Sequence, residues 1–308
     1  MPLSDNKKIV ENSEELIVTL RKIFGKNPGV RPAHAKGLLL EGTFTPTAEA
    51  SSLSSAPHFK RASTPVVGRF SNASGFPQLP DTDKNSIANG FAIRFQLEET
   101  PRRVHTDIIT VASPFFPVKN AEEALGFFGG VADGTVEQFV ATHPAAARAV
   151  TAPKKFPVSL ATQKYFGIHA FKFINAESVE TYIRYRFVPK AGEKHLDDED
   201  VKTKPDGYLF DALPGIVETG SIDFDIVAQI AEEGDVTDDA TAIWPEDRKI
   251  VKLGTVSLNK IKENNEAEQK HIIFDPVPRV DGIEPSNDPL IDLRATIYLL
   301  SGKDRRAA

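Results

Sequence analysis

The chain lacks cysteine altogether, and it has only one methionine and one tryptophan among its 308 residues. Without thiols there is no disulfide bond, no cysteine nucleophile, no iron–sulfur cluster and no cysteine-ligated zinc site. Any chemistry at this protein must therefore rest on oxygen and nitrogen groups.

Long apolar runs and basic clusters are also missing. No stretch approaches the roughly 18 apolar residues that span a bilayer, and residues 1–8 lack the apolar core of a signal peptide. The formal net charge is −6, so a nucleic-acid backbone would meet a repelling surface. We therefore expect neither a membrane span nor a nucleic-acid partner. We expect a cytoplasmic location, with a periplasmic or secreted chain that has lost its leader left open.

A hydrophobic content of 40% in a chain of this length is enough to bury a large core. We predict a single domain over residues 1–308. It would have an N-terminal helix in residues 1–25, a barrel with inserted helices in residues 30–260 and a last helix in residues 286–305. Two smaller domains are the alternative that the length leaves open.

Before the last helix, helical patterns occur in three places. Polar and acidic residues at 12–15 precede an apolar stripe at helical spacing, which predicts that the first helix begins there. Residues 120–150 are rich in alanine and begin with Asn120, a good cap, so helices are expected. The acidic stretch 196–210 is predicted to form another helix.

Elsewhere the hydrophobic pattern has a period of two, which is typical of strands. The eight strand candidates are residues 36–44, 65–71, 90–97, 107–112, 167–174, 180–188, 221–230 and 250–258. Eight strands fit an antiparallel barrel, whose closure removes exposed edges. The predicted fold class is therefore α+β, an eight-stranded antiparallel β-barrel surrounded by helices.

The last helix carries an unusual pair. Asp288 can cap it and Pro289 suits its first turn, so Arg294 and Tyr298 lie four residues apart on one face. A guanidinium in reach of the phenol would favour a phenolate, which is a hard anionic metal ligand. On spacing alone, an Arg–Tyr pair stacked on a helix surface is the commoner explanation.

Several other short motifs stand in a definite order along the chain. They are His34-Ala-Lys-Gly37, Gly68-Arg-Phe-Ser-Asn72, Asn89-Gly-Phe-Ala-Ile-Arg-Phe95, Thr106-Asp-Ile-Ile109 and Ala242-Ile-Trp-Pro-Glu-Asp-Arg248. With Arg294 and Tyr298, this ordered set over roughly residues 25–305 resembles the catalase superfamily, specifically its short catalase-related haem peroxidases. The resemblance implies a haem cofactor, haem b, with Tyr298 as the axial ligand of the iron. We expect the barrel interior to offer the space for a flat tetrapyrrole.

The same resemblance assigns roles on both sides of the haem. It implies that His34 is the distal base, that Ser71 pairs with its ring nitrogen, and that Arg294 hydrogen-bonds Tyr298. Without the resemblance, a packed histidine and a strand-end serine would be preferred.

Arginines and phenylalanines would hold the rest of the haem. Arg31, Arg69 and Arg305 match the family's propionate-binding arginines, because buried carboxylates need fixed cations. Phe115, Phe116 and Phe127 are candidates to cover the faces of the macrocycle, and Phe127 is the nearest match to the family's stacking phenylalanine. Among 20 phenylalanines, core packing is the default for any one of them.

One departure from the family pattern bears on activity. Large catalases carry a distal asparagine, and here Val111 stands at its position. We therefore predict a peroxidase that uses hydrogen peroxide or organic hydroperoxides with a small organic reductant, and with weak catalase activity. Two alternatives stay open: a haem-dependent fatty-acid hydroperoxide isomerase resembling allene oxide synthase, and a non-catalytic haem- or lipid-binding barrel. The sequence also leaves a homodimer open.

Overall fold

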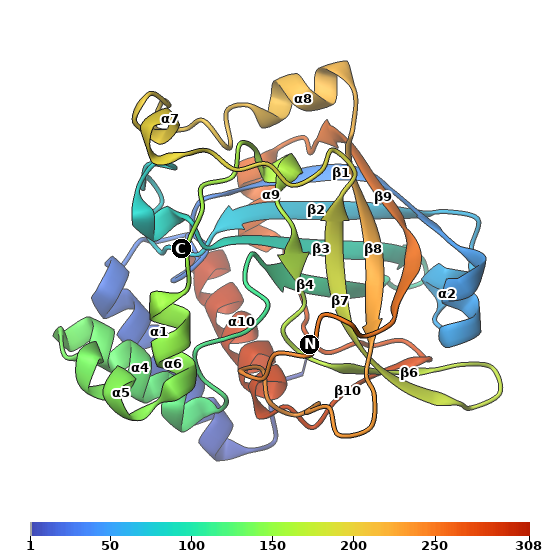
Figure 1. Ribbon diagram of the computed structural model, residues 1–308, viewed down its shortest axis with the longest axis horizontal. Helices are drawn as coiled ribbons and strands as arrows, with labels where there is room; N and C mark the ends of the chain where they lie inside the picture. Colours follow the sequence, from blue (N-terminus) through green and yellow to red (C-terminus); the bar gives the residue numbers. More distant parts are fainter. Residues whose placement is uncertain (1) are drawn as a thin grey trace.

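The computed structural model describes residues 2–308, and within them ten strands form one sheet that closes on itself (Figure 1). The strands are β1 (Gly37–Pro46), β2 (Thr64–Asn72), β3 (Asn89–Glu98), β4 (Val104–Val111), β5 (Tyr165–Phe166), β6 (Phe171–Ile174), β7 (Glu180–Pro189), β8 (Ile222–Ile230), β9 (Ile250–Ile261) and β10 (Ile283–Pro285). All neighbours are antiparallel. The ring runs β1-β2-β3-β4-β5-β7-β8-β9 and closes where β9 pairs with β1. The predicted eight-stranded antiparallel barrel is confirmed.

Alternation along each strand divides the barrel into two faces. In β3, Phe91, Ile93 and Phe95 are fully buried and point inward, whereas the intervening Ala92 and Arg94 point outward. The largest buried side chains of the interior are aromatic: Phe44, Phe70, Phe91, Phe95, Tyr165, Phe173, Phe187 and Phe224. They leave the interior filled, as is usual for eight strands. The expectation of space inside the barrel for a tetrapyrrole is therefore wrong, and a functional pocket must lie outside it.

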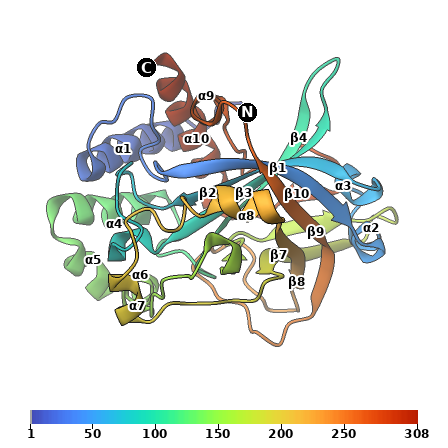
Figure 2. The same cartoon turned by 90° about the horizontal axis from the view of Figure 1, so that it is seen from above.

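Helices cover one side of the barrel and both of its ends. They are α1 (Lys7–Phe24), α2 (Ala48–Leu53), α3 (Pro57–Lys60), α4 (Ala121–Asp133), α5 (Val136–Thr142), α6 (Pro144–Thr151), α7 (Asp198–Lys202), α8 (Leu213–Thr219), α9 (Asn265–His271) and α10 (Pro289–Ala307), with short 3-10 turns at Lys84–Ser86 and Leu160–Thr162. Helix α1 packs against both α4 and α10. Seen from above, α10 lies outside the ring of strands (Figure 2).

Two helices differ from the sequence prediction. Helix α1 begins at Lys7, capped by the Asn6 side chain, so Ser13 lies within the helix and its hydroxyl donates to the Ile9 carbonyl at 2.6 Å. The stretch 196–210 is helical only in α7. Pro205 then ends the helical pattern, because proline has no N–H and disfavours helical geometry at the residue before it.

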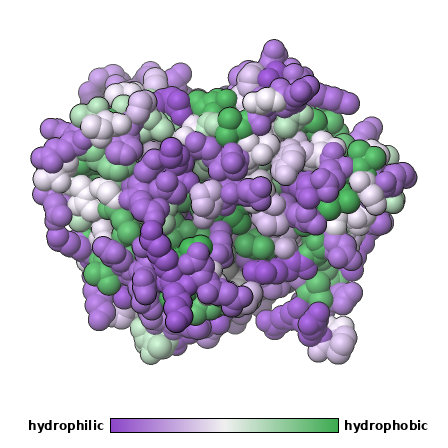
Figure 3. All heavy atoms as spheres, turned by 90° about the horizontal axis from the view of Figure 1, so that it is seen from below, coloured by the Kyte–Doolittle hydropathy of each residue, from purple (hydrophilic) through white to green (hydrophobic). Residues whose placement is uncertain are grey.

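The surface is mostly polar. Figure 3 shows one face, on which hydrophilic residues dominate and hydrophobic ones form separate patches. Isolated apolar side chains on a surface are ordinary and need no partner. Within residues 2–308, no helix combines the length and the apolar character that crossing a bilayer requires.

Candidate functional site

A row of paired residues on the outer face of the barrel forms the floor of the site. Ser71 pairs with Gly90 across β2 and β3, and Gly90 pairs with Val111 across β3 and β4. Directly paired residues of antiparallel strands point to the same face, with Cβ atoms about 5 Å apart. Because the neighbouring Phe70 and Phe91 point inward, this row points outward.

His34 lies on this row. Its Nδ1 is 3.0 Å from the Ser71 hydroxyl oxygen, which confirms that the two side chains meet. A Cβ atom on Gly90 would come within 3.0 Å of the His34 ring, so only glycine lets the imidazole lie this close to β3. Val111 is the next residue of the row beyond Gly90. The first side chain beside the imidazole in that direction is therefore apolar.

The backbone of His34 is held in an unfavourable conformation. Its φ of 56° falls in the left-handed region, which costs a residue other than glycine on the order of 1–3 kcal/mol. The Arg69 guanidinium donates to the His34 carbonyl at 3.0 Å, and the His34 N–H donates to the Ala73 carbonyl at 3.3 Å. These bonds fix the backbone that aims the imidazole.

The electrostatic surroundings keep the His34 imidazole neutral. Burial, followed by the charges of Arg69, Arg294 and Arg31, lowers its pKa to about 3. As a whole, the residue keeps some accessible surface. Within the described part of the chain, its Nε2 has no hydrogen-bond partner. His34 therefore presents a free basic nitrogen.

Tyr298 lies on α10, and Arg294 holds its phenol oxygen. The Arg294 Nε and Nη2 groups both donate to Tyr298 Oη, at 3.0 and 2.8 Å. The predicted pairing of guanidinium and phenol one turn apart is thus present. Two charge-assisted donors on one oxygen fix the direction of the phenol group.

The hydrogen bonds continue beyond Arg294 to two residues. Arg294 Nη1 lies 2.6 Å from His169 Nε2, and His169 Nδ1 lies 2.7 Å from an Asp288 carboxylate oxygen. Because Arg294 can only donate, Nε2 accepts and Nδ1 carries the proton that goes to Asp288. Burial lowers the pKa of His169, in keeping with a neutral ring. The other Asp288 oxygen accepts from the Leu290 N–H at 2.9 Å, which caps α10.

His169 was missed in the sequence. It lies in the gap between β5 and β6, 119 residues before Asp288. A break in the predicted strand 167–174 is the only local signal, and it does not indicate a partner. Asp288 was expected as a helix cap, which is confirmed, but its contact with His169 was not foreseen.

Three arginines, here called the arginine trio (Arg31, Arg69 and Arg305), gather at the edge of the site. Arg31 and Arg305 both donate to the Ile272 carbonyl, at 3.0 and 2.8 Å. Arg69 donates to the His34 carbonyl and, at 2.9 Å, to the Gln269 side-chain oxygen. Arg69 and Arg305 are buried, whereas Arg31 keeps some accessible surface.

The arginine trio has only neutral partners. Within residues 2–308, no carboxylate forms an ion pair with any of the three. Burial, followed by the charge of Arg305, lowers the pKa of Arg69 to about 9. Burial and Arg306 lower that of Arg305 to about 10. The pKa of Arg31 falls well below its usual value through burial, Arg69 and Arg305, and the nearby Tyr298 opposes this. The positive charge of the arginine trio is therefore not compensated by a carboxylate in contact with it.

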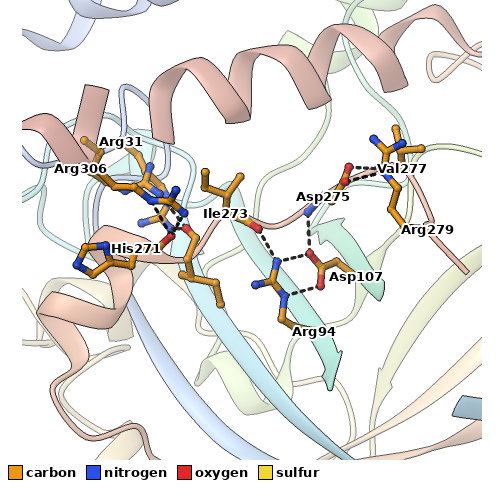
Figure 4. A network of polar contacts seen from close by, with 11 residues as sticks. Arg31, Arg94, Asp107, His271, Ile273, Asp275, Val277, Arg279 and Arg306 are labelled. Atoms are coloured by element: carbon orange, nitrogen blue, oxygen red, sulfur yellow. Dashed lines mark hydrogen bonds and ion pairs between the residues drawn. The ribbon is translucent and has the colours of Figure 1, made fainter. Parts of the chain in front are cut away.

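The segment after α9 connects the arginine trio to a second arginine group. Figure 4 shows Arg31 and Arg306 at the start of this segment, and Arg94 with Asp107 further along. Arg94 forms a two-point ion pair with Asp107, at 2.8 and 2.7 Å, and also donates to the Ile273 carbonyl. The Asp275 N–H donates to Asp107 at 2.7 Å. The segment is thus held by side chains at successive backbone positions.

Apolar side chains complete the walls. A cluster of half-buried residues joins the row on the barrel to helix α10: Val111, Phe116, Leu125, Phe127, Phe128, Phe139 and Ile297. Two of the three candidate phenylalanines, Phe116 and Phe127, belong to this cluster. The third, Phe115, is buried outside it, with the Arg148 guanidinium 4.7 Å from the centre of its ring.

Comparison with known proteins gives concordant matches. Residues 28–307 match the family model described as catalase. The chain is 35% identical to the catalase-related peroxidase of Synechococcus elongatus over 95% of this chain and 88% of the relative. It is 33% identical to that of Mycolicibacterium paratuberculosis over 95% and 94%. A solved bacterial catalase, 26% identical, superposes with a TM-score of 0.80 over 99% of this chain, which spans 62% of that structure's length.

Proposed function

This chain belongs to the catalase family, and we propose that it is a haem-dependent peroxidase that reduces hydrogen peroxide or organic hydroperoxides with a small organic electron donor. The family makes it an oxidoreductase and implies a haem cofactor and a peroxide substrate. One observation carries the proposal. Arginines without a carboxylate partner adjoin both a histidine and a tyrosine: Arg69 donates to the His34 carbonyl, and Arg31, which shares the Ile272 carbonyl with Arg305, lies within electrostatic reach of Tyr298.

The donor set fits haem. Haem has two carboxylates on one edge, and Arg31, Arg69 and Arg305 offer cations without counter-ions there. Tyr298 Oη accepts two hydrogen bonds and donates none within the described residues, so it can act as an anionic ligand of the iron. Phe127 and Ile297 would contact the apolar macrocycle.

Bound there, haem would supply the iron at which the O–O bond of the peroxide is cleaved. His34 would accept the peroxide proton at Nε2 and return it to the departing oxygen, which leaves as water or alcohol. For this, Nδ1 must carry the ring proton and donate it to the Ser71 hydroxyl, and the 3.0 Å contact between the two atoms provides the acceptor.

Arg294 would act on the opposite face of the haem, where it holds Tyr298. Its two donors to Tyr298 would hold the phenolate and its direction. Neutral His169 and anionic Asp288 in turn hold Arg294, so this cation has a carboxylate behind it. The ligand would therefore keep one fixed geometry and an anionic character.

Val111 favours organic hydroperoxides over hydrogen peroxide. Val111 stands beside His34 where an amide could orient a small second peroxide. The valine side chain instead offers an apolar contact to the alkyl group of an organic hydroperoxide. An organic donor then supplies the two electrons that return the enzyme to its starting state. Haem b as the cofactor, a homodimer, a cytoplasmic location and the single-domain organisation stay predictions.

The test is turnover of the haem-loaded protein with cumene hydroperoxide, with and without guaiacol. We expect guaiacol to be oxidised at a rate that depends on both substrates. Consumption of the hydroperoxide without any donor, with a rearranged product, would instead indicate an isomerase. A haem spectrum that does not respond to peroxide would indicate a binding protein and contradict the proposal.

A further inference from the structure

We propose that Gln269 is a positioning residue for the anionic edge of the haem: it holds Arg69 through a neutral hydrogen bond and so leaves the guanidinium charge to a propionate. This inference rests on the proposed haem site. Gln269 lies on α9, in a charged stretch that the sequence analysis did not connect to the site.

The contacts of Gln269 fix its amide in one orientation. Its Oε1 accepts from Arg69 Nε at 2.9 Å, whereas its Nε2 donates to the Gly37 carbonyl at 3.0 Å and to Asn265 Oδ1 at 2.9 Å. Arg69 can only donate and the Gly37 carbonyl can only accept, so the opposite orientation would break both contacts. Only an amide satisfies both neighbours.

Helix α9 is itself fixed on β1, which keeps Gln269 in register with Arg69. The Leu39 N–H donates to Asn265 Oδ1 at 3.2 Å, and Asn265 Nδ2 donates to the Leu39 carbonyl at 2.8 Å. Gly37 has no side chain, and a Cβ atom there would come within 2.5 Å of Arg69 Cζ. The guanidinium therefore lies flat against β1, between Gln269 and the His34 carbonyl.

The buried arginines of this protein have two kinds of partner. Arg186 has the Glu246 carboxylate in contact, whereas Arg69, Arg184 and Arg305 are bound by neutral acceptors. Arg184 still has carboxylate charges near it, but the charge that acts on Arg69 is that of another arginine, Arg305. A carboxylate on Arg69 would satisfy the cation before any ligand arrived. Arg69 and that carboxylate would together carry no net charge. The carboxylate would also repel a haem propionate, so the cost of burying the propionate would not be offset by a free cation. We therefore assign the amide at residue 269 to the selection of an anionic cofactor edge.

The test compares three variants of the haem-free protein titrated with haem and with haem dimethyl ester, which has no propionate charge. Gln269→Glu adds a carboxylate beside Arg69, Gln269→Leu removes the hydrogen bonds without adding charge, and Gln138→Glu adds the same charge on the exposed face of α5. For haem, we expect Q269E to lose about tenfold in affinity, Q269L about threefold, and Q138E almost nothing.

Two further readouts separate charge from mere structure. The difference between Q269E and Q269L should vanish with the dimethyl ester. In thermal unfolding of the haem-free proteins the order should reverse, with Q269E unfolding at a higher temperature than Q269L, because the glutamate keeps its contact with Arg69. A purely structural Gln269 predicts that Q269L, which loses more contacts, is the weaker binder of both compounds.

The outcomes distinguish this inference from the proposed function. If the wild-type protein binds no haem, the proposed function is overturned and the inference with it. If it binds haem but Q269E binds as well as Q269L, or the gap persists with the dimethyl ester, only the inference is overturned. Should Q269E fail to fold, Q269L decides alone: a loss well above threefold for haem would contradict the inference.

Discussion

Arg94 and the arginine trio both contact the segment after α9, but their charges have different partners (Figure 4). Arg94 has its carboxylate in Asp107, and Asp107 also accepts from the Asp275 backbone. The arginine trio, a few residues away along the same segment, is bound only by carbonyls and one amide. The charge of Arg94 is therefore compensated within the protein. The charges that lower the pKa of each member of the arginine trio belong to other arginines, so a ligand with carboxylates could compensate the trio.

The largest expected effect tests the paired group. Asp107→Ala leaves the half-buried Arg94 without a counter-ion and removes the acceptor of the Asp275 N–H, so it should lower the free energy of unfolding by about 3–5 kcal/mol. Urea denaturation of the haem-free protein measures it. Glu263→Ala, which breaks the exposed Lys260 pair, serves as the control and should cost at most about 1 kcal/mol.

Removing one arginine of the trio should change the stability of the haem-free protein far less. Arg31→Leu removes one hydrogen bond, and the Ile272 carbonyl keeps its bond from Arg305. Relief of repulsion within the arginine trio should offset that loss, so the stability of the haem-free protein should stay within about 1 kcal/mol of wild type. A cost as large as that of Asp107→Ala would break the comparison.

A further prediction concerns the role of His34 in peroxide cleavage. His34→Ala should spare haem binding and slow peroxide cleavage by about 10²-fold or more, because no other base faces the peroxide. Stopped-flow spectroscopy of the haem band after addition of peroxide measures it. His195→Ala, an exposed histidine, is the control, and an equal loss in both variants would remove His34 from the mechanism.

The third prediction is a pH dependence of stability. The unfolded chain takes up a proton near pH 6.5, whereas burial lowers the folded pKa of His34 to about 3. Protons therefore favour the unfolded state in this window, and the contribution of His34 is present above pH 6.5 and lost as pH falls toward 3. Between pH 7 and pH 4, the haem-free wild type should lose about 1–3 kcal/mol more than His34→Ala. Equal losses would show that the imidazole is not buried.

The smallest expected effect concerns the substrate. Val111→Asn would add an amide beside His34 and should raise turnover of hydrogen peroxide relative to cumene hydroperoxide by about threefold. Val111→Leu changes size without adding a donor and is the control. A ratio that is unchanged in V111N, or that rises equally in V111L, would show that position 111 does not select the peroxide.

The sequence predicted what local spacing determines. The period of two located seven of the eight strands of the ring, whereas the predicted strand 167–174 missed β5 and contains β6, which lies outside the ring. Arg294 and Tyr298 meet because residues four apart share a helix face. Ser71 and His34 were paired only through the resemblance to a family, since 37 residues separate them. Periodicity carries no information on which of two distant side chains meet.

The missed features share a physical cause. His169 and Gln269 act through partners 119 and 200 residues away, and their own neighbours in sequence do not distinguish them from structural or surface residues. Phe115 and Phe116 were both candidates, and they lie in an irregular segment without a period, so the sequence could not tell which of them packs with Val111 and Phe127. The space for a ligand was expected inside the barrel, but aromatic packing fills the interior.

The most direct test of the account is a titration of the haem-free protein with haem, followed by absorbance, for wild type and Tyr298→Phe. We predict one haem per chain in the wild type, with a phenolate-ligated ferric spectrum, and loss of that spectrum with at least about tenfold weaker retention in Y298F. A wild-type protein that binds no haem would contradict the account. So would a Y298F variant with unchanged spectrum and affinity, since the iron would then be held by another residue.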